Sequence, residues 1–175
     1  MGRRTSRTSS KSRQGFGRNT LKGMGVMRPA RSKSGLVVCK VCGIYFTGKR
    51  WVHSTKAKIS KTEEAGTHFT VCPACRMEKD RACEGEVVLR NISPKQKQEV
   101  LAVIRRCHAI AFARDPLERV LRVEERGKTT RVLTSENQLA VRIGRELKQA
   151  FKGTLDIRWS RNDEPVYVVW DGARV

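Results

Sequence analysis

Two cysteine pairs constrain the fold of this chain more than any other feature of its sequence. Cys39 and Cys42 form the first pair, in "VCKVCGIYFTGKRW", and Cys72 and Cys75 form the second, in "VCPACRMEK". A C-x2-C spacing lets one tight turn present both sulfurs to one edge of a tetrahedron, so two such turns can supply all four ligands of a zinc ion. We therefore predict one Zn2+ bound by these four cysteines. Because protein fills all four positions, the metal is expected to be structural and not catalytic.

Other interpretations of the thiols stay open at this point. A redox pair of the thioredoxin type is disfavoured, because no βαβ pattern surrounds either pair. A metal-delivery protein is a further alternative. Additional side chains are available as replacement ligands or as a second, partial site: His53, His68, Cys83, Cys107 and His108.

The charge of the chain predicts its class of partner. The sequence has 37 Lys and Arg against 17 Asp and Glu, a net charge of +20. Such a charge favours a polyanion, most simply nucleic acid. No apolar run has the length of a membrane-spanning helix, and no export signal is recognisable, so we expect a cytoplasmic protein with reduced thiols and no membrane partner.

Residues 1–35 are predicted to be a disordered basic tail. Residues 1–33 contain ten Lys and Arg and no acidic residue, with Ser, Thr and Gly between them. Such a segment buries too little apolar surface to offset its chain entropy. We expect its cations to contact phosphates: Arg3, Arg4, Arg7, Lys11, Arg13, Arg18, Lys22, Arg28, Arg31 and Lys33.

Residues 36–92 are predicted to form a zinc-ribbon domain of short strands around the two cysteine pairs. The strand-like stretches are "VVCK", "GIYFTGKRWVHS", "THFTVC" and "EGEVVLRNI". Lys49, Arg50 and Trp51 would form a basic and aromatic set for contact with an RNA backbone and its bases. The alternative for Trp51 is a place in the ribbon core.

Residues 93–175 are predicted to form an α+β domain. "SPKQ" at 93–96 and "SENQ" at 135–138 are capping boxes that begin two amphipathic helices, the first ending before Pro116 and the second at Gly153. Each helix is followed by a pair of strands, the first pair joined at Gly127. We therefore expect a four-stranded antiparallel sheet with two helices on one face. The fold class is α+β: a small zinc ribbon with four cysteine ligands, then this domain.

The cysteine region resembles the zinc-binding region of the large-ribosomal-subunit export adaptor family, in a short bacterial or archaeal type of relative. The matching residues are Cys39, Cys42, Gly43, Tyr45, Arg50, Trp51, Cys72, Pro73, Cys75, Glu84 and Arg90. A weaker similarity covers the following α+β segment, so the two together span roughly residues 37–92 and 130–170. The family's additional N-terminal metal-binding pair is absent, and a basic tail stands in its place. The resemblance implies a role at the ribosome or on rRNA, without the export function.

No motif for catalysis or for a small-molecule substrate is present in the sequence. There is no Ser–His–Asp set, phosphate-binding glycine loop or paired-carboxylate site. The leading hypothesis is a non-enzymatic RNA-binding protein whose partners are rRNA or a ribosomal subunit, with ribosomal proteins as further partners. The alternative is a DNA-binding, transcription-associated zinc ribbon, although no helix shows the residue pattern of a major-groove reader.

Overall fold

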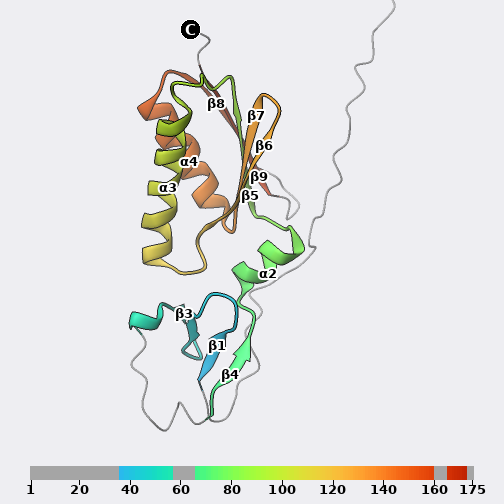
Figure 1. Ribbon diagram of the computed structural model, residues 1–175, viewed down its shortest axis with the longest axis vertical. Coiled ribbons are helices and arrows are strands. Elements are labelled where there is room, and N and C mark those ends of the chain that lie inside the picture. Colours follow the sequence, from blue (N-terminus) through green and yellow to red (C-terminus); the bar gives the residue numbers. More distant parts are fainter. Residues whose placement is uncertain (1–35, 57–65, 160–164, 173–175) are drawn as a thin grey trace, which may run out of the picture.

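The structure is a computed structural model that describes residues 36–56, 66–159 and 165–172. A small sheet is formed by β1 (Val37–Cys39), β2 (Tyr45–Phe46), β3 (Trp51–Val52) and β4 (His68–Thr70), in the order β3-β2-β1-β4. β1 is antiparallel to β2 and parallel to β4. A short 3-10 helix, η1 (Ser54–Lys56), follows β3. The small sheet lies at one end of the molecule, as Figure 1 shows.

The larger sheet has five strands in the order β6-β7-β5-β9-β8. They are β5 (Gly85–Arg90), β6 (Val120–Arg126), β7 (Thr129–Thr134), β8 (Gly153–Arg158) and β9 (Val166–Gly172). The two predicted hairpins, β6–β7 and β8–β9, are present as antiparallel pairs. β5 lies between them, antiparallel to β7 and parallel to β9.

The predicted four-stranded antiparallel sheet is therefore wrong in two details. The sheet has a fifth strand, β5, and the β5–β9 pairing makes it mixed. The sequence "GEVVLR" is a strand, as predicted, but it belongs to the larger sheet and not to the ribbon. Val87 and Leu89 of β5 are fully buried in the core of the larger sheet, which explains why the strand pairs there.

Two helices cover one side of the larger sheet, as predicted (Figure 1). They are α3 (Lys97–Arg114) and α4 (Asn137–Ala150), and α4 packs directly on β5, β7, β8 and β9. Leu139, Ile143 and Leu147 of α4 are completely buried against the sheet. Among the described residues, none of the helices combines the length and the hydropathy of a membrane span.

The two predicted capping boxes have different outcomes. At the first, the Gln96 N–H donates to Ser93 Oγ at 3.3 Å and the Ser93 hydroxyl donates to Gln96 Oε1 at 3.0 Å, but these bonds close the turn before the helix. The helix itself begins at Lys97, with Gln96 as its N-cap residue and no side-chain capping bond. At the second, Ser135 Oγ accepts from the Arg119 N–H at 2.8 Å and donates to the Leu117 carbonyl. Ser135 therefore caps no helix, because its hydroxyl holds the preceding loop in place.

Candidate metal centre

The first cysteine pair is positioned by the turn that follows β1. The Gly43 N–H donates to the Cys39 carbonyl at 2.8 Å, and Gly43 adopts φ +73°. This left-handed conformation strains any residue with a Cβ, so a glycine at this position allows the turn to close tightly.

The second pair is positioned by a helix that the sequence analysis missed, α2 (Pro73–Asp80). Cys72 is its N-cap residue, and Cys72 Sγ accepts the N–H of Cys75 at 3.5 Å. Pro73 occupies the first turn, where its missing N–H costs nothing. A proline followed by good helix formers was the available signal, but a cysteine cap is uncommon.

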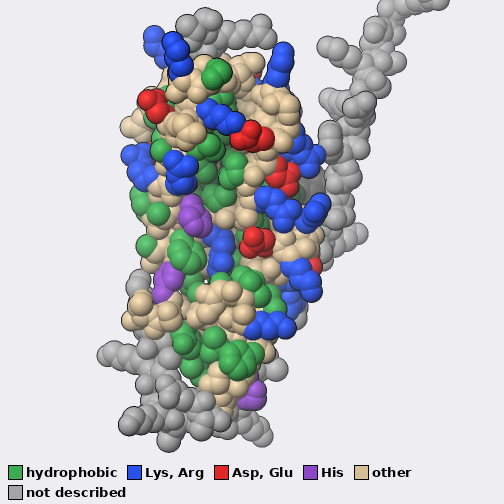
Figure 2. Space-filling view, viewed as in Figure 1, with side chains coloured by type: hydrophobic (Ala, Val, Ile, Leu, Met, Phe, Trp, Pro, Cys, Tyr) green, Lys and Arg blue, Asp and Glu red, His purple; other side chains and the backbone are tan. Residues whose placement is uncertain are grey.

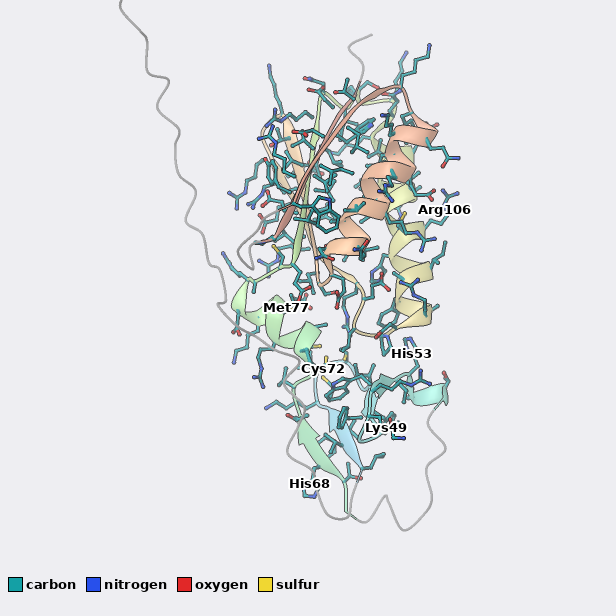
Figure 3. All side chains as sticks on the ribbon, turned by 180° about the vertical axis from the view of Figure 1, so that it is seen from behind. Lys49, His53, His68, Cys72, Met77 and Arg106 are labelled. Atoms are coloured by element: carbon teal, nitrogen blue, oxygen red, sulfur yellow. The ribbon has the colours of Figure 1, made fainter. Side chains whose placement is uncertain are left out.

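The four predicted ligands come together. The Sγ atoms of Cys39, Cys42, Cys72 and Cys75 all lie within 4.8 Å of one another, and those of Cys42 and Cys72 are 3.7 Å apart. Sulfurs at the corners of a zinc tetrahedron, with Zn–S distances of about 2.3 Å, would be roughly 3.8 Å apart. The cluster is thus of the right size to hold a metal ion. Figure 3 shows Cys72 between α2 and the small sheet, beside other sulfurs.

Hydrogen bonds and burial affect the thiols unequally. Burial raises the pKa of Cys39, but hydrogen bonds outweigh it, among them one from the Cys72 N–H at 3.3 Å, and lower the pKa to about 6. Burial raises the pKa of Cys72 to about 12, and burial together with neighbouring sulfurs raises the pKa of Cys75. Burial therefore disfavours the thiolate forms of Cys72 and Cys75, whereas hydrogen bonds favour the thiolate of Cys39. A bound divalent cation would supply the charge that stabilises four thiolates.

Arg119 brings a positive charge to the sulfurs from the other half of the molecule. Its Nη1 donates to Cys75 Sγ at 3.9 Å and its Nη2 to Cys42 Sγ at 3.8 Å. The residue is only 8% exposed. Burial lowers the pKa of Arg119, but the Cys42, Cys72 and Cys75 sulfurs outweigh it and raise that pKa. A tetrathiolate zinc site has a net charge of −2, so a buried cation beside it suits such a centre.

The Arg119 guanidinium is held in place by its own surroundings. Nε donates to the Pro116 carbonyl at 3.0 Å, and Nη2 donates to the same oxygen. The guanidinium carbon lies 5.2 Å from the centre of the Phe112 ring, a cation–π arrangement. His53 Nε2 forms a 2.6 Å hydrogen bond with the Phe112 carbonyl, which joins the ribbon to the end of α3. No local pattern in the sequence distinguishes Arg119 from the other arginines, so its place beside the sulfurs could not be predicted.

The core around the cysteine cluster and the small sheet is called here the ribbon core. It includes residues from the part of the molecule built on the five-stranded sheet, called here the larger half. Trp51 packs on Phe46 with ring centroids 5.4 Å apart, and the same cluster contains the buried Leu121 of β6 and the partly buried Leu117. On its surface, Arg122 of β6 donates to the Glu78 carbonyl of α2. The cysteine cluster therefore lies at the junction of the two sheets.

The residues predicted to contact nucleic acid have different positions. The ten tail cations, Arg3 to Lys33, lie outside the described residues. Lys49 and Arg50 are exposed in the turn between β2 and β3. Trp51 is only 5% exposed and belongs to the ribbon core, so its ring is not available for stacking on a base.

Cysteine and histidine side chains outside the cluster have other roles. Cys107 is buried in the core of the larger half. Cys83 lies outside that core, and burial raises the pKa of its thiol to about 11. His108 Nδ1 accepts the Val120 N–H at 3.0 Å, while burial lowers the pKa of the ring. His68 is exposed on β4. Among the described residues, no second group of three or more potential ligands comes together.

Comparison of the chain with protein-family models gave no match, and comparisons with curated proteins and with solved structures gave no significant match. The resemblance to the ribosomal export adaptor family therefore stays a prediction from the residues that carry it.

Proposed function

We propose that this protein is a non-enzymatic zinc-ribbon protein of the cytoplasm that binds rRNA or a ribosomal subunit. The observation that carries the proposal is the cluster of four cysteine sulfurs, two of which accept hydrogen bonds from the buried Arg119. Four thiolates at tetrahedral spacing suit Zn2+, which binds soft sulfur ligands and needs no redox change. With no open coordination position, the metal would stabilise the ribbon and perform no chemistry.

The charge of the molecule supports nucleic acid as the partner. Its net charge is +20, and Lys40, Lys49 and Arg50 are exposed on the ribbon. None of these three side chains has an acidic partner among the described residues. Exposed Lys and Arg side chains are the groups that contact phosphates in nucleic-acid complexes. Figure 2 shows that Lys and Arg also lie over much of the larger half.

Binding to purified ribosomal subunits and rRNA fragments, measured against salt concentration, tests this function. We expect the affinity to fall by about a thousandfold or more between about 50 and 200 mM salt, as for about six phosphate contacts. A variant lacking residues 1–33 should retain stoichiometric zinc and show a shallower slope, because ten cations are removed. Equal affinity at low and high salt, or purified protein without zinc, would contradict the proposal. Cross-linking in cells mainly to DNA would favour the transcription-associated alternative.

A further inference from the structure

The strand register of the small sheet places four apolar side chains in one row. Phe69 of β4 is opposite Val38 of β1, Val38 is opposite Tyr45 of β2, and Tyr45 is opposite Val52 of β3. Residues directly opposite each other point to the same face of a sheet. The row Phe69–Val38–Tyr45–Val52, called here the outer row, therefore crosses all four strands.

The outer row lies on the face that does not form the ribbon core. Val37, Phe46 and Trp51 alternate with its members along the strands and are buried in that core. No member of the outer row belongs to the core cluster of the described residues. Phe69, on the edge strand, is 69% exposed, the highest value among the large apolar side chains described. Figure 2 shows hydrophobic side chains on the surface of this end of the molecule.

Cations lie at both sides of the outer row. Lys40 follows Val38 by two residues, and its N–H extends the β1–β4 ladder by donating to the Thr70 carbonyl at 2.9 Å. On the other side, Arg50 precedes Val52 by two residues and closes the hairpin, where the Thr47 N–H donates to its carbonyl at 2.9 Å. Both side chains are exposed. An aromatic surface between cations has the chemistry of a single-stranded nucleic-acid site, where bases stack and phosphates meet positive charge.

We infer that the outer row is a platform on which unpaired bases of single-stranded RNA stack, with Phe69 as the principal stacking side chain. This inference rests on the proposed function and specifies the RNA that the ribbon contacts. The stacking role predicted for Trp51, whose ring is buried, is thereby assigned to Phe69, whose ring is open to solvent. A second copy of the chain is a less suitable occupant, because Lys40 and Arg50 would repel the same cations of the copy.

Two fluorescently labelled probes test the platform with the full chain. One is a mixed-sequence single-stranded RNA of about 12 nucleotides, within the site sizes of single-strand binders. The other is a ribose-phosphate chain of the same length without bases. Both probes present the same number of phosphates to the lysines and arginines of the protein. A difference between their affinities therefore measures the contribution of contacts with the bases. We expect the RNA to bind about tenfold more tightly than the abasic chain.

Substitutions then assign that difference to the outer row. Phe69→Ala should lose about tenfold in affinity for the RNA and nothing for the abasic chain, whereas Phe69→Tyr should bind both probes like the wild type. Val123→Ala, at an exposed apolar position on the larger sheet, is the matched control and should change neither affinity. Phe69 is mostly exposed, so these variants are expected to fold normally.

The possible failures can be distinguished. Salt-sensitive binding that is equal for the two probes, and unchanged in Phe69→Ala, would overturn the platform while leaving the proposed function intact. An absence of binding to both probes at low salt would contradict the function itself. If sedimentation shows that the wild type is an oligomer and Phe69→Ala a monomer, the outer row is an interface between copies and the inference is wrong.

Discussion

Arg119 contacts the cysteine cluster and its own loop at the same time. Its two terminal nitrogens reach Cys75 and Cys42, while Pro116 and Phe112 hold the guanidinium from behind. A planar guanidinium can make these contacts together, whereas an ammonium group presents a single point of charge. Arg119, supplied by the larger half of the molecule, therefore fixes two sulfurs of the candidate metal centre.

Replacing Arg119 should weaken metal binding. Loss of a partner to a metal ligand typically costs about 10–100-fold in metal affinity, so we expect about tenfold weaker zinc binding in Arg119→Ala and a smaller loss in Arg119→Lys. Competition with a chromophoric chelator measures the affinity. Arg122→Ala is the matched control, because Arg122 bonds the Glu78 carbonyl instead of a sulfur. Wild-type affinity in Arg119→Ala would show that the contact with the sulfurs is incidental.

Glu136, the N-cap residue of α4, should make stability depend on pH. Burial, followed by the charges of Glu84, Glu118 and Asp115, raises its pKa from 4.5 to about 7. Its side chain forms no capping hydrogen bond in compensation. Between pH 4.5 and about 7 the folded state binds more protons than the unfolded state, so stability falls as the pH rises through this range.

The substitution Glu136→Gln removes this titration. We expect the variant to be more stable than the wild type by about 1 kcal/mol at pH 8, after allowance for partial exposure, and the two to converge near pH 4. Urea unfolding across this pH range gives the two curves. The exposed Gln138→Ala on the same helix should follow the wild-type curve. Equal stabilities at pH 8 would refute the assigned role of Glu136.

At the scale of elements, the approach of α4 to β5 depends on a glycine. A Cβ on Gly85 would lie 2.5 Å from Ala140 Cβ and 2.5 Å from Thr134 Oγ1. Neither neighbour is the end of a long, flexible side chain, so a methyl group would push the helix away from the sheet. Gly85 thus permits β5 to enter the larger sheet at its centre.

Gly85→Ala should destabilise the protein by about 1–3 kcal/mol through overpacking, although alanine restricts the unfolded chain more than glycine does. Denaturant unfolding measures the loss. For comparison, Gln149→Ala on the exposed side of α4 should stay within about 0.5 kcal/mol of the wild type. A Gly85→Ala variant as stable as the wild type would mean that α4 shifts without cost.

At the scale of the whole molecule, the described residues form two cores of different kinds. The larger core contains fifteen buried residues from α3, α4 and the five-stranded sheet. The ribbon core is smaller, includes Cys39, Cys72 and Cys75, and is completed by Leu121 from β6. Three of the four candidate metal ligands belong to the ribbon core, so we expect the folding of that core to depend on a bound metal and the folding of the larger core not to.

Removal of the metal with a chelator should therefore open one part of the molecule first. In hydrogen exchange, we expect amides of β1, β4 and α2 to lose protection, together with the loop around Arg119. Amides of β5, β9 and α4 should remain protected. Restoring zinc serves as the control and should restore the ribbon's protection. Simultaneous loss of protection in α4 and β9 would show instead that the metal stabilises the whole chain as one cooperative unit.

Local patterns in the sequence were sufficient for much of this structure. The cysteine spacing identified four sulfurs that do come together, and periodicity located α3, α4 and both hairpins of the larger sheet. These features are local, because a knuckle turn, a helix and a hairpin each depend on residues close together in the chain. The hydrogen bond between Ser93 and Gln96 is local for the same reason, although the helix begins after it, at Lys97.

Only the tertiary structure decided which distant segments meet. The residues of β5 suit a strand in either sheet, and the place of β5 beside β9 depends on burying Val87 and Leu89 beneath α4. Arg119 lies 77 residues from Cys42 and 44 from Cys75, and Trp51 was free to be a surface or a core residue until its partners were known. A residue's own neighbourhood in sequence specifies its local geometry. Its partners in space are chosen by the burial that the whole chain can achieve.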